Sequence, residues 1–541
     1  MRTKQDRLRV LKTVLAEESV ETPLRELPVS VSGGTGAAGL SVEHAAGSVV
    51  ASAGGGATEK SGGSAAVGAS IPRTDPPRPA VGGVPRLRSG RPVLPSGPRR
   101  VEGVPGATPG RLVSLDAFRG FIMTMLAAGG FGILKFSQLP EDAPVWTVAD
   151  RAFWQGMGFH FEHPAWLSVF DGWRVSFWDL IQPAFMFMVG VAMPFSYVRR
   201  RSQGHGWLSM SAHAILRAVV LVLLGVLLSS LGKPRTNWIF PNVLCQIGLG
   251  YYFAWLLLNR GLAVQVSVLV LLLCGYWGWF RINPPAEGYD YVAVNADVSK
   301  GEVFEGKWAA WSKNANAAYL VDDSLLRSLR NAELPAVAED GPAAVRGGWR
   351  AAIFGNPEPY VPNVGGYTTL NFVPSIATTL LGILCGECLL SLTLSRWQKL
   401  LRLVLLAVVC LGLGLLAHAT VCPAVKRIWT PSWALVSGGY VIGMLAVFYV
   451  LFDLLPLRWL AFPLVVVGTN SILIYVLGQT LNGWVREQFI RVHFAGVIEQ
   501  LFGPRALDPA WYGAITMPTA VFATFWLLLF WLYRQRIFLR I

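Results

Sequence analysis

Long apolar stretches constrain the fold of this 541-residue chain more than any other feature. A helix needs about 20 mainly apolar residues to cross a bilayer, and ten stretches of roughly that length occur. They run over residues 112–134, 176–198, 211–231, 241–258, 262–280, 369–391, 398–418, 431–453, 460–481 and 512–533. Only 14% of the residues are charged, whereas soluble domains carry about 25%. The chain is therefore predicted to be an integral membrane protein.

The apolar pattern predicts an all-α, polytopic bundle of about 10 transmembrane helices. Runs of about ten residues with alternating polarity, which would indicate a membrane β-barrel, do not occur, and helices satisfy their own backbone polar groups within lipid. Pro463, Gly468 and Asn470 interrupt the ninth stretch. Two shorter passes at this point, and 11 helices in all, are the alternative.

Composition divides the chain into two parts. Residues 1–110 are rich in Gly, Ala, Ser, Pro and Arg and nearly free of aromatic residues, so they cannot bury enough apolar surface to fold. We expect them to be a disordered cytoplasmic tail, and residues 111–541 to be the membrane domain. The connections at about 135–175, 281–368 and 482–511 are far longer than neighbouring helices in a bundle need, so we expect them to carry function.

Lys and Arg in the short connections predict the orientation of the bundle. They follow every even-numbered stretch, as at Arg199–Arg201, Arg260, Arg396, Arg458 and Arg534. This places both termini in the cytoplasm and the three long loops on the outer face of the plasma (inner) membrane. The formal net charge of +14 lies largely in the tail and these short loops, so we expect no nucleic-acid partner.

The expected outer loops are rich in aromatic and amide side chains. The first contains Trp146, Trp154, Trp166 and Trp173, and the second contains Trp308, Trp311, Asn314 and Asn316. Such side chains suit a polar, ring-shaped ligand such as a sugar. The alternative is an aromatic belt at the membrane interface.

The first apolar stretch opens with a polar cluster. Ser114 is placed to cap the helix, Asp116 lies in the first turn where the helix dipole favours a carboxylate, and Arg119 lies one turn later, within reach of Asp116. One interpretation is a self-neutralised helix start. The other is an Arg on the cytoplasmic face that meets the phosphates of an anionic acyl donor.

Ionisable residues near the outer face are the candidates for chemistry. Asp179 lies just inside the second stretch, where a charge is costly unless it is paired, so it is either functional or a helix-start carboxylate. His163 can act as a general base or accept an acyl group. Its neighbours His160 and Glu162 supply too few ligands for a metal site, so no metal is expected.

Lys426 and Arg427 precede Trp429 on the expected outer side, against the usual preference for cations inside. Either they bind a carboxylate or sulfate of an acceptor, or they pair with loop acids such as Glu162 and Asp171. The residues alone leave these two alternatives open.

Five stretches, in this order, resemble the heparan-alpha-glucosaminide N-acetyltransferase family and its bacterial homologues. They are Ser114–Gly120, Asp179–Gly190, Val243–Gly248, Lys426–Ser432 and Gly468–Tyr475. The resemblance covers about residues 111–541 and excludes the tail. It implies transfer of an acetyl group from cytoplasmic acetyl-CoA to an amino sugar or other glycan acceptor on the far side of the membrane.

The resemblance also implies roles for individual residues. The family's catalytic His lies in a Phe-Lys-His-Ala-Ser-Trp pattern, which matches Phe161–Trp166 and puts His163 in the catalytic place. The implied site comprises His163 and Asp179 for catalysis, Asp116, Arg119 and Gln246 for the acyl donor, and Lys426, Arg427, Trp429, Asn470 and Trp166 for the acceptor. Ala127 and Gln246 depart from the family pattern, where Asn and Arg are usual.

Two other classes of function are alternatives. A transporter or flippase of a polar lipid or sugar usually contains internal repeats with paired broken helices, and the two halves of this chain share none. A catalytically silent membrane scaffold would fit the departures at Ala127 and Gln246. The expected partners are the lipid bilayer, an acyl donor, a sugar acceptor and a second copy of the chain.

Overall fold

The computed structural model describes residues 112–164, 166–330, 348–355, 360–455 and 457–539. The expected disordered tail, residues 1–110, lies outside these ranges. Within them the regular secondary structure is helical, and the β-structure is a single isolated antiparallel bridge between Phe170 and Arg174. The all-α prediction is confirmed.

Seven helices in the described ranges are long and apolar enough to cross a membrane. They are α5 (Phe177–Ser202), α6 (Trp207–Ser229), α8 (Leu262–Ile282), α11 (Phe372–Leu390), α12 (Arg396–Thr420), α13 (Pro431–Tyr449) with the π-helical η6 (Val450–Leu454), and α19 (Gly513–Arg534). The chain is therefore a membrane protein, as its composition predicts.

Two further candidate spans are bent. α2 (Val113–Ala127) meets the segment of η1 (Gly129–Gly132) and α3 (Ile133–Ser137) at 50°, and α14 (Phe462–Thr469) meets α15 (Ser471–Thr480) at 78°. α7 (Val243–Leu256) is apolar but has only 14 residues. The described part of the chain thus has 7 candidate spans, or 9 if each bent pair is one span. The count of 10 or 11 remains a prediction.

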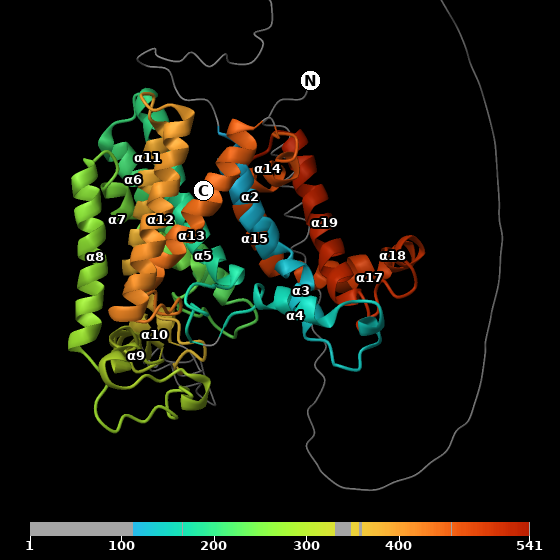
Figure 1. The fold of residues 1–541 in the computed structure, drawn as a ribbon, viewed down its shortest axis with the longest axis horizontal. Coiled ribbons are helices and arrows are strands. Elements are labelled where there is room, and N and C mark those ends of the chain that lie inside the picture. The colour runs from blue at the N-terminus through green and yellow to red at the C-terminus, as the bar shows by residue number, and fades with distance from the viewer. Residues whose placement is uncertain (1–111, 165, 331–347, 356–359, 456, 540–541) are drawn as a thin grey trace, which may run out of the picture. The chain divides into compact units, whose positions relative to one another are not determined.

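The central helices of the bundle are α11, α5 and α13 (Figure 1). On one side of them α11 also contacts α7 and α8, and α6 packs on α7. On the other side α2 contacts α13 and packs on α14 and α15, and α14 contacts α19. The C-terminal helices thus pack around the first apolar helix of the chain.

Glycines allow two helix pairs to approach closely. In the α5–α11 pair, a Cβ on Gly190 would overlap the carbonyl oxygen of Thr379, and one on Gly382 would overlap that of Phe187. In the α2–α14 pair, Gly468 lies equally close to the carbonyl of Asp116. Small residues at helix contacts are typical of membrane bundles, where dispersion contacts replace the hydrophobic effect.

The long connections contain short helices. These are η2 (Pro144–Thr147), α4 (Arg151–Phe159), η3 (Val298–Lys300), η4 (Gly306–Trp311), α9 (Ala317–Arg330), α10 (Gly348–Phe354), η5 (Thr369–Asn371), α16 (Asn482–Trp484), η7 (Val485–Ile490), α17 (Arg491–His493) and α18 (Ala495–Phe502). In the loop after α8, Trp311 and Ala318 pack in one buried cluster with Trp166, Phe280 and Ile428. The loop also holds a buried ion pair of 2.7 Å between Lys313 and Glu302. This loop is a folded cap rather than a simple linker.

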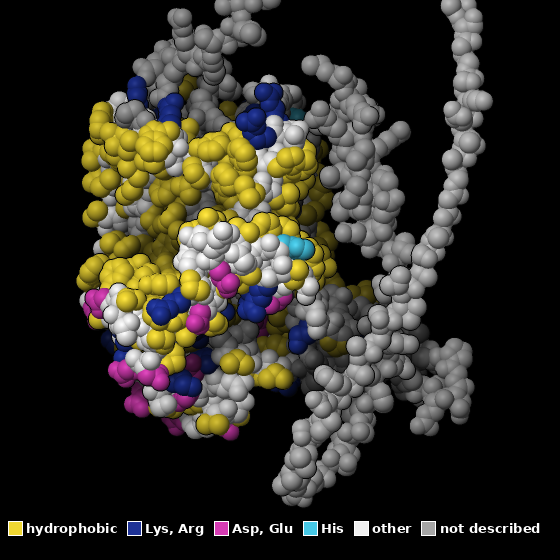
Figure 2. Space-filling view, turned by 90° about the vertical axis from the view of Figure 1, so that its right-hand side faces the viewer, with side chains coloured by type: hydrophobic (Ala, Val, Ile, Leu, Met, Phe, Trp, Pro, Cys, Tyr) yellow, Lys and Arg dark blue, Asp and Glu magenta, His cyan; other side chains and the backbone are white. Residues whose placement is uncertain are grey.

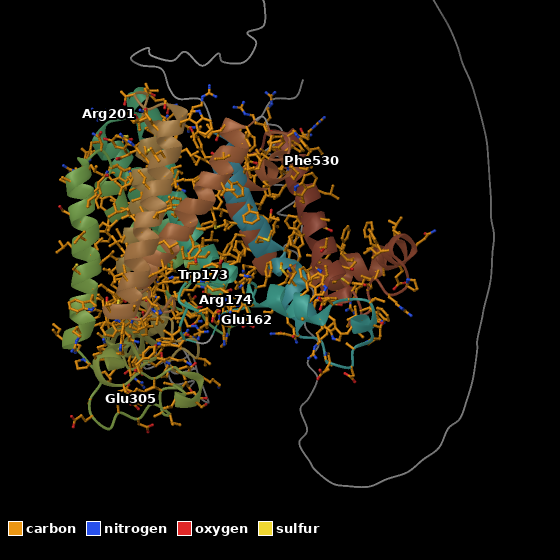
Figure 3. All side chains as sticks on the ribbon, viewed as in Figure 1. Glu162, Trp173, Arg174, Arg201, Glu305 and Phe530 are labelled. Atoms are coloured by element: carbon orange, nitrogen blue, oxygen red, sulfur yellow. The ribbon has the colours of Figure 1, made fainter. Side chains whose placement is uncertain are left out.

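Charge is distributed unequally along the bundle. Figure 2 shows an apolar band, with Lys and Arg beyond its upper edge and with both Asp/Glu and Lys/Arg beyond its lower edge. Arg201, in the last turn of α5, lies at the upper end, and Glu305 lies at the lower end (Figure 3). A band of this kind between two polar ends is the surface expected of a chain that spans a bilayer.

The start of α2 differs from the expected Ser114 cap. Ser114 lies inside the helix, and its hydroxyl oxygen is buried without a hydrogen-bond partner among the described residues. Asp453 of η6 supplies the cap instead, because its carboxylate accepts the backbone N–H groups of Val113 at 3.2 Å and of Ser114 at 3.1 Å. Asp116 and Arg119 do approach one another, at 3.8 Å, as their spacing predicts.

Candidate functional site

His163, Asp179 and Lys426 meet in one cluster, although they come from three parts of the chain. Nδ1 of His163 lies 2.8 Å from Oδ1 of Asp179, and Nζ of Lys426 lies 3.0 Å from the same oxygen. Lys426 Nζ is also 3.3 Å from His163 Nδ1. The side chains of Asp179 and Lys426 are 5% and 4% exposed, whereas that of His163 is 44% exposed. The imidazole of His163 is therefore accessible to solvent, and it contacts a buried ion pair.

The start of α5 holds the His163 loop in place. The hydroxyl of Ser176, the residue before the helix, donates to the carbonyl of Glu162 at 2.7 Å, and the N–H of Trp178 donates to the carbonyl of His160 at 2.9 Å. Asp179 follows in the first turn, where the helix dipole favours a carboxylate. The same helical turn thus fixes both the loop and the carboxylate that contacts the imidazole.

A turn before α13 delivers Lys426. The N–H of Trp429 donates to the carbonyl of Lys426 at 2.9 Å, and Trp429 has a positive φ of 48°. The backbone N–H of Lys426 donates to the Ser168 hydroxyl at 3.0 Å, and the Ser168 N–H donates to the carbonyl of Ala424 at 3.0 Å. These two reciprocal bonds join the turn to the loop that carries His163.

The hydrogen bonds define which imidazole nitrogen is available. A carboxylate can only accept, and Asp179 is nearer to Nδ1 than Lys426 is, so we assign the ring proton to Nδ1, which donates to Asp179. Lys426 then donates to Asp179 and not to the imidazole. Nε2 then keeps its lone pair and can take a proton or attack a carbonyl carbon. Asp179 orients the ring and would stabilise the imidazolium that forms, as carboxylates do in His–Asp pairs. Lys426 compensates the buried negative charge.

His160 lies near this cluster but does not share its partners. Burial and the positive charge of Arg174 lower the pKa of His160 below its ordinary value. Arg174 itself pairs with Asp171 at 2.8 Å and lies over the ring of Phe159. Across the described ranges no three His, Cys, Asp or Glu side chains gather as a metal site would require.

Arg427 and Lys426 have different partners from those expected. Lys426 pairs with Asp179 rather than with Glu162 or Asp171, and its burial leaves no surface for an acceptor. Arg427 donates to the carbonyls of Pro164 at 3.0 Å and Gly365 at 3.2 Å. Arg427 thereby joins the loop that carries His163 to the loop that follows α8.

Trp166 and Trp429, which the resemblance assigns to the acceptor, are both buried in the structure. Trp166 is 1% exposed and donates through Nε1 to the carbonyl of Trp311 at 2.9 Å. Trp429 is fully buried and donates to the Thr378 hydroxyl at 3.2 Å. A ring that is packed on both faces cannot stack on a sugar, so these residues support the site from within.

The side-chain amides of Gln246 and Asn470 form hydrogen bonds with the backbone of the chain. Nε2 of Gln246 donates to the carbonyls of Phe240 at 3.0 Å and Thr369 at 2.9 Å. The amide of Asn470 donates to the carbonyl of Ile537 at 3.1 Å and accepts the N–H of Leu539 at 2.8 Å. The structure does not group Gln246 with Asp116 and Arg119, because α7 packs on α6 and α11 whereas α2 packs on α14, α15 and α13.

Trp173 is an exposed aromatic residue on the same loop as His163, the loop that precedes α5. Its side chain is 62% exposed, and its backbone carbonyl accepts the hydroxyl of Tyr440 at 2.6 Å. In the view of Figure 3 it lies in the same region as Arg174 and Glu162. Sequence reasoning named Trp173 only as one of four loop tryptophans, because nothing in the sequence distinguishes an exposed ring from a buried one.

Comparison with known proteins adds no assignment. No family model and no curated protein matches the chain. The resemblance to the N-acetyltransferase family therefore remains a prediction from its five motifs. The geometry of His163, Asp179 and Lys426 is the independent observation on which a function can be argued.

Proposed function

We propose that this chain is a membrane acyltransferase that moves an acetyl group from cytoplasmic acetyl-CoA to the amine of a sugar on the outer face. The observation that carries the proposal is the contact between the exposed imidazole of His163 and the buried pair of Asp179 and Lys426. A buried carboxylate bound to a solvent-facing His is a recurrent arrangement for general-base and nucleophilic catalysis.

The proposed reaction needs one proton acceptor near the incoming amine. Nε2 of His163 takes a proton from the amine as its nitrogen attacks the thioester carbonyl carbon. The C–S bond then breaks, and the coenzyme thiolate takes the proton from the imidazolium. Asp179 stabilises the transient positive charge, and the products are an N-acetylated sugar and free coenzyme A. No oxidant, reductant or metal enters this balance.

The proposal requires a defined topology. Both termini lie in the cytoplasm, and the loops that carry His163 and Lys426 face outward across the plasma (inner) membrane. Its support is the basic end at Arg199–Arg201 and the acidic side chains beyond the opposite edge of the apolar band (Figure 2). Asp116 and Arg119 at the start of α2 keep their proposed role toward the acyl donor.

Acetyl transfer in proteoliposomes tests the proposal. Labelled acetyl-CoA is supplied on one side and a panel of amino sugars on the other, for wild type, His163→Ala and the matched control His160→Ala. Loss of a positioned base lowers turnover by about 10²- to 10⁴-fold, so we expect that loss for His163→Ala. His160→Ala is expected to stay within about threefold of wild type, since His160 does not contact Asp179.

Two outcomes would contradict the proposal. Full acetyl transfer by His163→Ala would remove His163 from the chemistry. Movement of unmodified sugar across the bilayer without acetylation would instead select the transporter alternative. Equal thermal stability of the two variants ensures that a rate difference reflects the site and not the fold.

A further inference from the structure

A pocket with a basic lining lies between α5, α6 and α7, at the opposite end of α5 from Asp179. Its basic side chains are Arg200, in the last turn of α5, and His213 and Arg217 of α6, and its aromatic walls include Tyr197, Tyr251 and Trp255. This pocket shares no residue with the His163 cluster, and none of the roles proposed above uses it.

The lining contains cations but no carboxylate. A side-chain nitrogen of Arg200 donates to Nε2 of His213 at 2.7 Å, because an arginine can only donate. Arg217 donates to the hydroxyl of Tyr251 at 3.3 Å and lies over its ring at 5.0 Å. Neither arginine has an ion pair with Asp or Glu within the residues that the structure covers, in contrast to Arg151, Arg174, Arg327 and Arg491.

Arg217 lies unusually deep for an unneutralised cation. It is ten residues after the first residue of α6, Trp207, which corresponds to about 15 Å along a helix that rises 1.5 Å per residue. Its Nε is buried and has no hydrogen-bond partner in the described ranges. A cation inside a membrane helix is expensive and normally faces a partner or a polar cavity, so an anion is the missing complement.

The lipid-facing side of α6 indicates the source of that anion. Ile215, Leu216 and Val219 are 44%, 60% and 47% exposed and flank Arg217 on the same helix. Acyl chains can lie on these residues while a phosphate lies among the arginines. Basic pockets between membrane helices, near the end rich in Lys and Arg, are typical sites for anionic lipid head groups.

We infer that the pocket between α5, α6 and α7 binds a phosphate group, supplied by an anionic phospholipid of the leaflet at the Arg199–Arg201 end. Arg200 and Arg217 hold the phosphate oxygens, and the tyrosine hydroxyls supply further hydrogen bonds. This inference is independent of the acetyl-transfer proposal and is tested without measuring activity.

Native mass spectrometry of the purified full chain in neutral detergent can count bound lipids. Phosphatidylglycerol is titrated against phosphatidylcholine for wild type, Arg200→Gln, Arg217→Gln and the matched control Arg199→Gln, whose side chain is exposed and outside the pocket. Wild type and Arg199→Gln are expected to retain one phosphatidylglycerol in preference to phosphatidylcholine. Either pocket variant is expected to bind it about tenfold more weakly, as loss of one charge-assisted hydrogen bond predicts.

A second arm identifies the source of the phosphate. Inorganic pyrophosphate and coenzyme A are added to wild type and to Arg200→Gln. If they bind in an Arg200-dependent manner while phosphatidylglycerol does not, the lipid assignment is overturned in favour of a soluble phosphate. If no probe distinguishes wild type from Arg200→Gln, the pocket is not a phosphate site. Arg200 lies in the last turn of α5, so its variant remains interpretable even if Arg217→Gln fails to fold.

Discussion

The pair of Asp179 and Lys426 illustrates how much a single buried charge depends on its partner. Both side chains are almost fully buried, and they come from positions 247 residues apart. Breaking a buried pair leaves an uncompensated charge, whereas removing both charges can be nearly neutral. One oxygen of Asp179 contacts both Lys426 and His163, so a change in the ion pair also changes the orientation of His163.

A double-mutant cycle tests this coupling. Lys426→Met is expected to destabilise the fold by about 3–5 kcal/mol because Asp179 loses its cation. The double variant Asp179→Asn/Lys426→Met is expected to recover much of this loss while acetyl transfer stays low. Thermal unfolding in detergent measures the stabilities. Lys300→Met is the control, because Lys300 pairs with Asp297 at the surface, where a pair contributes at most about 1 kcal/mol. A double variant no more stable than Lys426→Met would show that the charges are not coupled.

Asp322 of α9 predicts a dependence of stability on pH. Burial raises the pKa of Asp322 from 3.8 to about 6, although its carboxylate accepts the N–H of Thr369 at 2.7 Å. Its other oxygen has no hydrogen-bond partner in the ranges described. Its charge helps to raise the pKa of Tyr360, and no Lys or Arg among the described residues offsets that charge. Because the folded pKa is raised, the stability contribution is present below about pH 4 and is lost as the pH rises to about 6.

Asp322→Asn removes this dependence. The shift corresponds to on the order of 3 kcal/mol, so the variant is expected to gain stability relative to wild type between about pH 4 and pH 6 and to keep a constant advantage above about pH 7. Thermal unfolding midpoints across this range measure the difference. If the difference in midpoint between the variant and wild type does not change with pH, the pKa of Asp322 is not raised by folding. If that difference narrows as the pH rises, folding lowers the pKa of Asp322 instead of raising it.

At the scale of helices, close approach sets the position of the site. α5 carries Asp179 and packs on α11 through Gly190 and Gly382, where the backbone of one helix lies against that of the other. The bend between α14 and α15 has a comparable effect on the C-terminal helices, because Asn470 at the bend binds the backbone of residues 537 and 539. Contacts between helices thus determine where Asp179 and Asn470 lie in the bundle.

Gly382→Ala is expected to destabilise the bundle by about 1–3 kcal/mol, because the added methyl group would overlap the carbonyl oxygen of Phe187 and force α5 and α11 apart. Gly412→Ala on α12 is the matched control. No atom lies within contact distance of a Cβ at Gly412, so helix propensity alone predicts a neutral effect or a gain of up to about 1 kcal/mol. Thermal unfolding compares the two variants. Equal midpoints would show that the α5–α11 contact tolerates a wider spacing.

At the scale of the whole molecule, the asymmetric charge predicts how the chain crosses the membrane. Val292 lies in the long loop after α8 and is 84% exposed, and Ser202 is exposed at the basic end of α5. In intact cells an impermeant maleimide is expected to label Val292→Cys, and to label Ser202→Cys only after lysis, because basic loops stay in the cytoplasm. Wild type controls for the native thiols, of which Cys274 is exposed on α8. The opposite labelling pattern would invert the proposed topology.

Much of the candidate site could be anticipated from sequence, and some of it could not. Asp179 was singled out because an ionisable residue just inside an apolar stretch needs a reason to be there. His163 was singled out because an imidazole can act as a general base, and the structure places the two side chains 2.8 Å apart. The partner of Lys426 was missed, since two charges far apart in the chain give no sign of contact. The burial of Trp166 and Trp429 could not be predicted, because aromatic residues serve equally well in a core and at a binding surface.

The sequence by itself determined that this chain is helical and belongs in a membrane, because long apolar runs must bury their backbone polar groups in helices wherever water is absent. It also determined the bend near Asn470, through local residues that disfavour a continuous helix. Only the tertiary structure decided that Asp453 caps α2, that Asp179 contacts both His163 and Lys426, and that Arg217 faces a pocket without a carboxylate. Contacts of this kind join segments hundreds of residues apart, and they form only when helix packing brings the segments together.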